Sequence, residues 1–209
     1  MAITRLGGAN AISGIIPTSV GGTGSTAATL PASLINNTSI GNVTALPASI
    51  PTGKVLQVVQ TIKTSQTAIS SEDTITEFIS ASITPSATSS KILITCNGVY
   101  GFTADNSFGH ILLFKGSSSI SGAIGDSNGS AYRATTGAAP RTAGGATNNV
   151  ARQFSFEYLD SPSTTSSTTY SGRAVATLNT TMYIGRSGTV SDDNRGSYIT
   201  SITLKEIDA

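Results

Sequence analysis

The sequence predicts an all-β protein, with an antiparallel β-sandwich of the jelly-roll kind preceded by an extended N-terminal arm. Three observations favour this class. β-Branched and aromatic residues alternate with polar ones through much of the second part of the chain, which is typical of half-buried strands. Clusters of Gly, Ser, Asn and Asp separate these segments. No segment of useful length has the apolar spacing of an amphipathic helix.

Residues 1–53 are interpreted as the arm because they carry a short repeat instead of a strand pattern. The motif apolar–Pro–small–Ser–apolar occurs as IPTSV, LPASL and LPASI. Each proline fixes φ at about −65° and favours an extended residue before it. We expect the arm to order against neighbouring chains, although a flexible Ser/Thr/Gly linker is the alternative. The attachment residues would be the apolar ends of the three motifs, Ile16, Val20, Leu30, Leu34, Leu46 and Ile50.

Residues 54–209 are interpreted as the β-sandwich domain. Short strands with turn-rich breaks are typical of an antiparallel sandwich or jelly roll. The two strands on either side of Asn179 suggest a hairpin, and the polar stretch 117–149 is expected to form surface loops with one short strand around Tyr132. The segments with strand character are 54–63, 75–85, 90–102, 108–116, 151–160, 168–178, 180–188 and 196–208.

The periodicity within these segments predicts which side chains form the core. In 75–85, Ile79 is expected on the face opposite Phe78. The uninterrupted apolar run in 108–116 is typical of a strand covered on both sides. Three further sets share one face each and are predicted to point inward: Ile92, Ile94 and Cys96; Phe154, Phe156 and Tyr158; and Tyr198, Ile202 and Leu204.

The composition argues against nucleic-acid and membrane partners. Charged residues make up 11% of the chain, against about 25% in a typical domain. Twelve Lys and Arg nearly balance eleven Asp and Glu, so the surface has no net field to attract polyanions. No apolar run approaches the roughly 18 residues of a membrane span, and the first residues lack the apolar run of a signal peptide. We therefore expect a chain made in a cytoplasm, without membrane insertion.

The residue types needed for catalysis or metal binding are scarce. Cys96 and His110 are the only cysteine and histidine; we expect a buried free thiol and a core or interface histidine, with a nucleophilic Cys–His pair on neighbouring strands as the alternative. Asp192, Asp193 and Asn194 could offer oxygen ligands to calcium, although such residues also favour turns. No motif pairs two carboxylates as in a glycosidase. We expect no enzyme, no metal and no cofactor.

Several segments resemble known virion proteins. MAITRLGGANAISGIIPTSVGGTGSTAA (1–28) resembles the opening of bacteriophage tail-fibre and related virion proteins, in which an Ile-Pro step followed by GGTG leads into a shaft. GKVLQVVQTIKT (53–64), YLDSPSTTSSTTY (158–170) and ITSITLKEID (199–208) look like a C-terminal β-domain of virion proteins from marine and freshwater phages, including those of cyanobacteria. The resemblance covers nearly the whole chain and implies a structural role in the virion.

The resemblance implies a short tail fibre or host receptor-binding appendage, assembled in the host cytoplasm and anchored in the virion by its arm. Its partners would be two further copies in a homotrimer, other tail or baseplate proteins, and a host surface glycan. Tyr132, Arg133, Arg141 and Arg195 lie in polar loops, carry groups suited to stacking and hydrogen bonding with glycans, and are the candidate receptor residues. The alternative is a capsid decoration (cement) protein whose arm straps onto capsid subunits.

Overall fold

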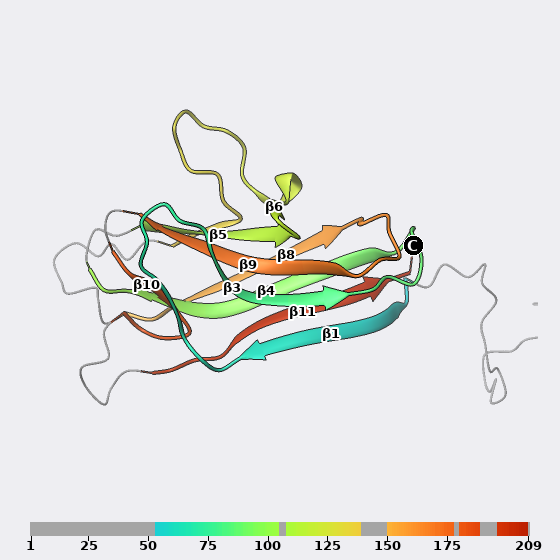
Figure 1. Ribbon diagram of the computed structural model, residues 1–209, viewed down its shortest axis with the longest axis horizontal. Coiled ribbons are helices and arrows are strands. Elements are labelled where there is room, and N and C mark those ends of the chain that lie inside the picture. The colour runs from blue at the N-terminus through green and yellow to red at the C-terminus, as the bar shows by residue number, and fades with distance from the viewer. Residues whose placement is uncertain (1–52, 105–107, 139–149, 178–179, 189–195, 209) are drawn as a thin grey trace, which may run out of the picture. The chain divides into compact units, whose positions relative to one another are not determined.

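The computed structural model describes residues 53–104, 108–138, 150–177, 180–188 and 196–208 (Figure 1). The chain divides into two units, Met1–Ile50 and Pro51–Ala209, and the described residues belong to the second. Apart from one short 3-10 turn at Ser121–Ala123, their regular secondary structure consists of strands joined by turns and loops. The strands are β1 (Val55–Lys63), β2 (Thr67–Ile69), β3 (Thr76–Ile83), β4 (Lys91–Phe102), β5 (Phe108–Lys115), β6 (Ser118–Ser119), β7 (Thr136–Ala138), β8 (Arg152–Asp160), β9 (Thr168–Thr177), β10 (Met182–Ile184) and β11 (Thr200–Ile207).

Two antiparallel sheets pack against each other, which confirms the predicted all-β sandwich. Sheet A has the order β1–β11–β4, with β8 on the other edge of β4, and β10 and β2 continue it beyond the end of β11. Sheet B has the order β3–β9–β5, with β6 and β7 on the other edge of β5. Without β2, β6 and β10, and with the equally short β7 kept as an edge strand of sheet B, the strands renumbered along the chain have the orders 1-8-3-6 and 2-7-4-5. This is the jelly-roll topology, a pair of interlocked Greek keys.

The core lies between the two sheets and contains most of the predicted side chains. Alternation along β4, β8 and β11 decides which residues enter it, because successive side chains of a strand point to opposite faces. Tyr158 is only partly buried. The predicted residues that are buried are Ile92, Ile94, Cys96, Phe154, Phe156, Ile202 and Leu204.

Two phenylalanine rings join the sheets at the centre of the core. Phe78 of β3 and Phe154 of β8 meet edge to face, with their ring centroids 5.7 Å apart. Each ring lies over a glycine of the neighbouring strand. A Cβ atom added to Gly98 would lie 2.7 Å from the Phe154 ring, and one added to Gly172 would lie 2.6 Å from the Phe78 ring. The missing side chains of these glycines therefore make room for the rings.

Strand β5 is covered on both sides, as its apolar run predicts. Ile111 and Leu113 face the main core between the sheets. Leu112 and Phe114 point the other way and pack, together with Val175 of β9, in a second apolar cluster. Ile124 and Ala134, from the segment between β6 and β7, cover that second cluster. The outer face of sheet B therefore has a cover made by the chain itself.

The predicted hairpin between 168–178 and 180–188 is wrong. Strand β9 belongs to sheet B, where it pairs with β3 and β5, whereas β10 belongs to sheet A, where it pairs with β4 and β2. The connection between them crosses from one sheet to the other, so proximity in sequence does not lead to pairing. The short strand expected around Tyr132 forms slightly later, as β7 at Thr136–Ala138.

Two predicted orientations are also wrong. A bulge in β3 between Glu77 and Ile79 interrupts the alternation, so Phe78 and Ile79 are both buried instead of opposed. Tyr198 precedes β11, which begins at Thr200, and its side chain is partly exposed. An alternating sequence pattern does not show at which residue a strand stops pairing with its neighbour.

Two buried carboxylates bind segments that are distant in sequence. Glu206 of β11 accepts hydrogen bonds from the backbone N and Oγ of Ser86 at 2.7 and 2.6 Å, and from Nε2 of Gln57 at 2.6 Å. Asp160 of β8 accepts one from the Tyr170 hydroxyl at 2.7 Å and pairs with Lys115 Nζ at 2.9 Å. These bonds attach β1 and the connection 84–90 to β11, and β8 to sheet B.

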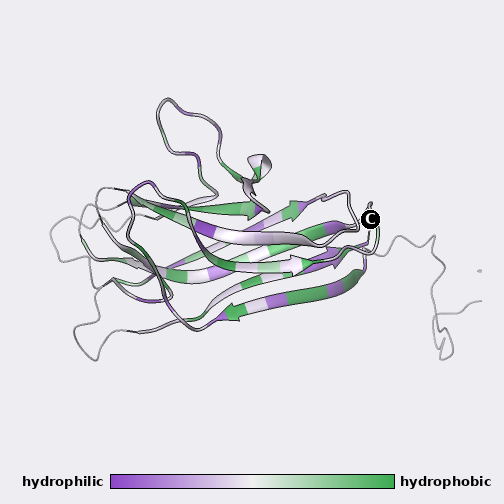
Figure 2. Cartoon of the chain, in the orientation of Figure 1, coloured by the Kyte–Doolittle hydropathy of each residue, from purple (hydrophilic) through white to green (hydrophobic). Residues whose placement is uncertain are grey.

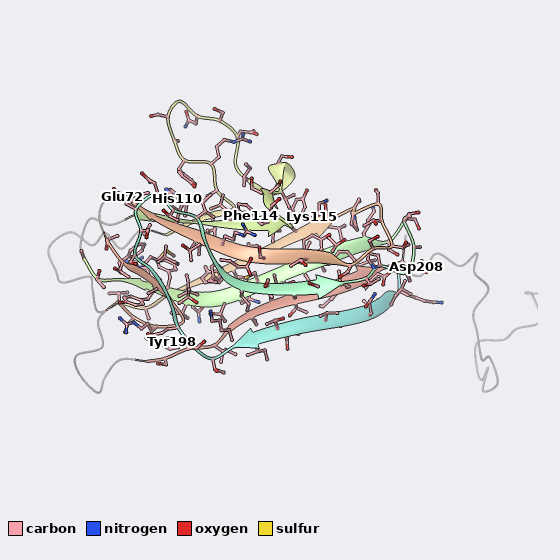
Figure 3. All side chains as sticks on the ribbon, in the orientation of Figure 1. Glu72, His110, Phe114, Lys115, Tyr198 and Asp208 are labelled. Atoms are coloured by element: carbon pink, nitrogen blue, oxygen red, sulfur yellow. The ribbon has the colours of Figure 1, made fainter. Side chains whose placement is uncertain are left out.

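The sandwich has two different ends. At one end, which we call the entry end, the backbone N of Asp208 donates to Lys54 O at 2.9 Å, and residues 1–52 join the domain there. The connections after β3 and β8 also lie at the entry end. The opposite end, which we call the loop end, receives the connections after β1, β4, β7, β9 and β10. Figure 3 shows Asp208 and Tyr198 at these opposite ends.

Candidate assembly face and receptor loops

The outer face of sheet A presents side chains from four long strands, and we call it the assembly face. It consists of the outward residues of β1, β11, β4 and β8, because the inward ones belong to the core. The register aligns them in rows across the strands. The three central rows, each in the strand order β1, β11, β4, β8, are Val58, Lys205, Leu93 and Leu159; Gln60, Thr203, Thr95 and Glu157; and Ile62, Ser201, Asn97 and Ser155.

One edge of the assembly face is an exposed apolar column along β1. Leu56, Val58 and Ile62 are each at least 42% exposed. Figure 2 shows the hydrophobic stretches along this strand. In the described part of the chain, no cluster comparable to the one outside sheet B covers them. Leu159 and Ile199 add further exposed apolar surface to the same face.

The polar side chains in the middle of the assembly face are bonded to one another across the strands. Gln60 Nε2 donates to Thr203 Oγ1 at 2.9 Å, and Thr95 Oγ1 donates to Glu157 Oε2 at 3.2 Å. In the next row, Ser155 Oγ donates to Asn97 Oδ1 at 2.6 Å. A surface whose polar groups already have partners loses fewer bonds to water when it is covered. These rows can therefore be covered at lower cost than unpaired ones.

The three central rows of the assembly face carry two opposite charges that do not pair with each other. Lys205 lies on β11 and Glu157 on β8, two strands and one row apart, so their backbones are about 12 Å apart at a strand spacing of roughly 4.8 Å and a rise of roughly 3.3 Å per residue. The ion pairs found among the described residues are Lys115–Asp160 and Arg173–Glu77, so neither charge has an ionic partner there. Both charges remain able to pair with groups outside the described residues.

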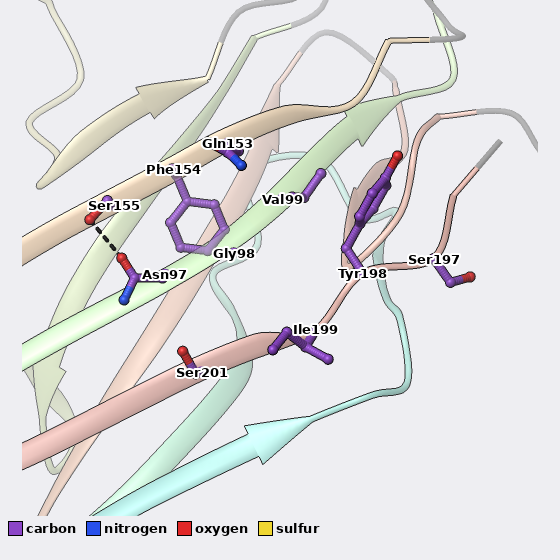
Figure 4. Close-up of a pocket in the computed structure, with 10 residues that line it drawn as sticks. All are labelled: Asn97, Gly98, Val99, Gln153, Phe154, Ser155, Ser197, Tyr198, Ile199 and Ser201. Carbon is purple, nitrogen blue, oxygen red and sulfur yellow. Dashed lines mark hydrogen bonds between the residues drawn. The ribbon is translucent and has the colours of Figure 1, made fainter.

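A shallow hollow of about 680 Å³ lies on the assembly face toward the loop end (Figure 4). Its floor is at Gly98 and Phe154, and Tyr198 and Ile199 stand at one side. None of its lining residues is an acid, a base or a thiol, so it offers hydrogen bonds and apolar contact and no catalytic group. The lining residues are Asn97, Gly98, Val99, Gln153, Phe154, Ser155, Ser197, Tyr198, Ile199 and Ser201.

Sequence reasoning missed this hollow. Its lining combines residues of β4, β8 and the segment before β11, which only the register between distant strands brings together. Gly98 is not a signal for it, because its missing side chain faces the Phe154 ring in the core and not the hollow.

Among the four candidate receptor residues, the structure describes Tyr132 and Arg133. The Tyr132 ring stacks on His110 of β5, with centroids 4.4 Å apart and planes 7° apart, outside sheet B. Arg133 Nε donates to Gly125 O at 2.7 Å. The structure therefore places the two residues in the covering segment of sheet B, with Tyr132 partly exposed.

Burial shifts the titration of this stacked pair. It raises the pKa of Tyr132, to which the negative charge of Asp73 adds, and it lowers the pKa of His110. Both shifts favour the neutral form of each ring. The pair therefore forms a neutral aromatic surface at physiological pH.

The other predicted site residues lie outside the described residues. They comprise all the attachment residues of the arm, two of the receptor candidates and the acidic cluster considered for calcium. These positions are Ile16, Val20, Leu30, Leu34, Leu46, Ile50, Arg141, Arg195, Asp192, Asp193 and Asn194.

The prediction of a buried free thiol is confirmed. Cys96 is fully buried in the core, and burial raises its pKa to about 12. The alternative Cys–His pair is wrong, because β4 and β5 belong to different sheets. Cys96 faces the core, whereas His110 stacks on Tyr132 outside sheet B, and is half-buried there. A thiol with this pKa and no solvent access does not act as a nucleophile.

Comparisons with known proteins add no family assignment. Within the residues that the structure describes, no three His, Cys, Asp or Glu side chains gather as they would around a metal ion. In the same residues, no helix has the length and apolar character needed to cross a membrane. No protein-family model matches the chain, and no curated protein matches it either.

Proposed function

We propose that the protein is a structural component of a bacteriophage virion, a short tail fibre or receptor-binding appendage that is anchored by residues 1–53 and assembled as a homotrimer. The observation that carries this proposal is the division of the sandwich into two ends. Residues 1–52 join at the entry end, and five connections gather at the loop end. An appendage needs this arrangement because attachment and receptor contact must take place at opposite ends.

In this proposal the arm attaches the domain to the virion. The apolar side chains on either side of its prolines bind neighbouring chains or tail proteins, with Ile16, Val20, Leu30, Leu34, Leu46 and Ile50 as the contact residues. Extended segments with prolines suit this task, since they make contacts along their length without forming a core of their own.

The loop end then faces the host. Arg141 lies in the connection from β7 to β8 and Arg195 in the connection from β10 to β11, both of which begin and end at the loop end. Tyr132 offers a neutral, partly exposed ring on the side of the domain. Arginine forks and aromatic faces are groups that hold sugar hydroxyls and ring faces. A host surface glycan is the ligand class that we propose for them.

A capsid decoration protein is the second candidate, and the jelly-roll strand order supports it. This topology is common in viral capsid domains and in lectins, so it suits both locations. In the decoration role, residues 1–53 would lie between capsid subunits and the sandwich would stand on the shell. Because one fold supports many functions, the topology does not choose between the two.

Copy number in the virion distinguishes these roles. Purified particles of the phage that encodes the chain are digested, and the chain is quantified by mass spectrometry against the major capsid protein. A copy number that is a small multiple of the number of symmetry-related subunits in the tail supports the appendage. A number comparable to that of the major capsid protein supports decoration, and absence from the particle refutes both. For the appendage, an excess of purified chain should also reduce phage adsorption to host cells.

A further inference from the structure

We infer that the assembly face packs against further copies of this chain, so that the β-sandwich itself holds the oligomer together. This inference deepens the proposed homotrimer and rests on it. The sequence pointed to the arm for self-association, whereas most of the exposed apolar side chains of the described residues lie on or beside sheet A. Leu56, Val58, Ile62, Leu159 and Ile199 all lie there.

The size of the face suits a protein interface. Its four strands are 8 to 12 residues long. At about 4.8 Å between strands and about 3.3 Å per residue, the face measures roughly 19 by 27 Å, or about 500 Å². In a head-to-tail ring each copy divides this face between two neighbours, so a closed trimer covers about 1,500 Å² over its three contacts, which in total is the area of one standard protein interface.

The charges favour a second copy over the chain's own arm as the occupant. Lys205 and Glu157 are charges of opposite sign on one face, and neither has an ionic partner among the described residues. Arg5 is the only charged side chain of residues 1–53, so the arm could pair with Glu157 and not with Lys205. A second copy brings both signs, and Lys205 of one copy can meet Glu157 of the next.

The shape of the face favours a closed ring. The apolar column of β1 forms one edge, while the hollow above Gly98 and Phe154 lies over β4 and β8 toward the other edge. An apolar edge of one copy can lie in the hollow of the next when different parts of the face meet, which is a head-to-tail contact. Such contacts close into rings, and three copies form the smallest ring beyond the two-fold dimer.

The first test replaces the apolar column. In the full-length chain, Val58→Asp together with Ile62→Asp places two charges in the interface, where they would have to be desolvated. Sedimentation velocity and light scattering measure the mass. We expect the wild-type chain at three times its monomer mass of 21.1 kDa and the double variant at monomer mass, or at least tenfold weaker in association. Ile75→Asp and Val150→Asp, exposed apolar positions outside the assembly face, are matched controls that should remain trimeric.

The second test exchanges the charges. Lys205→Glu alone and Glu157→Lys alone each place like charges together and should weaken the trimer. The double exchange restores the opposite signs and should restore the association. Both positions are on the surface of the sheet, and circular dichroism together with the melting temperature shows whether each variant remains folded.

Three outcomes would overturn the inference. A wild-type chain that sediments as a monomer excludes self-association, and would leave residues 1–52 or another partner as the cover. A trimer that survives Val58→Asp with Ile62→Asp places the contact elsewhere. If the double charge exchange does not restore the association, Lys205 and Glu157 do not pair between copies. The virion copy number tests the appendage role separately, since a tail component that is monomeric in solution refutes the interface and the homotrimer but not the location in the virion.

Discussion

Replacing Glu206 by glutamine tests how much one buried carboxylate at the entry end contributes to the free energy of unfolding. The carboxylate receives three hydrogen bonds, two from Ser86 and one from Gln57. A glutamine at this position has one oxygen, which can keep facing Ser86, but its amide NH₂ then meets the NH₂ of Gln57. Gln57 cannot turn over to resolve the conflict, because the same Nε2 also donates to Thr84 O at 2.7 Å.

The expected loss follows from these bonds. One N–H of the partly buried Gln57 amide loses its partner, which costs about 1–2 kcal/mol, and the two bonds from Ser86 weaken from charged to neutral, by roughly 0.5–1 kcal/mol each. We therefore expect Glu206→Gln to lower the free energy of unfolding by about 2–4 kcal/mol. For a domain of this size, that corresponds to a melting temperature lower by roughly 4–16 °C.

The measurement is urea unfolding followed by circular dichroism, with the slope m compared between variants to exclude a change in the unfolded state. Asp126→Asn is the control, because its side chain is exposed in the segment between β6 and β7, away from the assembly face, and its unfolding free energy should change by less than about 0.5 kcal/mol. Equal urea midpoints for Glu206→Gln and the wild-type chain would refute the reasoning.

The same carboxylate predicts a dependence on pH. Burial alone would raise the pKa of Glu206, but the hydrogen bonds from Ser86 and Gln57 outweigh it and lower the pKa from 4.5 to about 2. A group whose pKa is lower in the folded state stabilises it above the unfolded value. This contribution is complete above pH 4.5 and disappears as the pH falls toward 2. The difference in stability between the wild-type chain and Glu206→Gln should therefore narrow over that range, and a constant difference would contradict it.

Three further predictions concern the core, the thiol and the arm. Gly98→Ala should lower the unfolding free energy by about 1–3 kcal/mol, because the new methyl group lies 2.7 Å from the Phe154 ring; urea midpoints measure it, and an unchanged midpoint would show that the ring moves freely. Cys96 should resist iodoacetamide at pH 8 in the folded chain and react in denaturant, as intact-mass spectra would show; labelling of the native chain would contradict its burial. Incorporation into virions should be lost, with the melting temperature of the sandwich unchanged, when serine replaces Val20, Leu34 and Ile50 together.

Much of the fold could be predicted because alternation within a strand is a local property. The spacing of Ile92, Ile94 and Cys96 predicts that they share one face of the strand, and all three are buried. The hairpin across Asn179 was predicted by the same local logic and is wrong, because the choice of sheet for β10 depends on pairing with β2 and β4. The bulge beside Phe78 likewise depends on its partner strand β9.

The candidate assembly face shows the same division between local and distant information. The sequence shows that β1 is apolar, but whether Val58 is covered depends on how far the rest of the chain extends over sheet A. Its inward neighbour Val59 packs on the core, and the pattern alone does not distinguish the two. The hollow on this face is lined by residues of β4 and β8 that are more than fifty positions apart in the chain, so it depends on the register between these strands.

The position of β1 determines how the domain responds to a mechanical load. Residues 1–52 join its first residue at the entry end, and β1 runs antiparallel to β11 from the pair Val55–Ile207 to the pair Lys63–Thr200. A pull on the arm against a loop end that is held in place acts along the axis of β1. The hydrogen bonds to β11 are then loaded together in shear, instead of opening one after another as they would under a pull across the sheet. Separating β1 from β11 by tension along this direction therefore requires a larger force than separating them by a pull across the sheet.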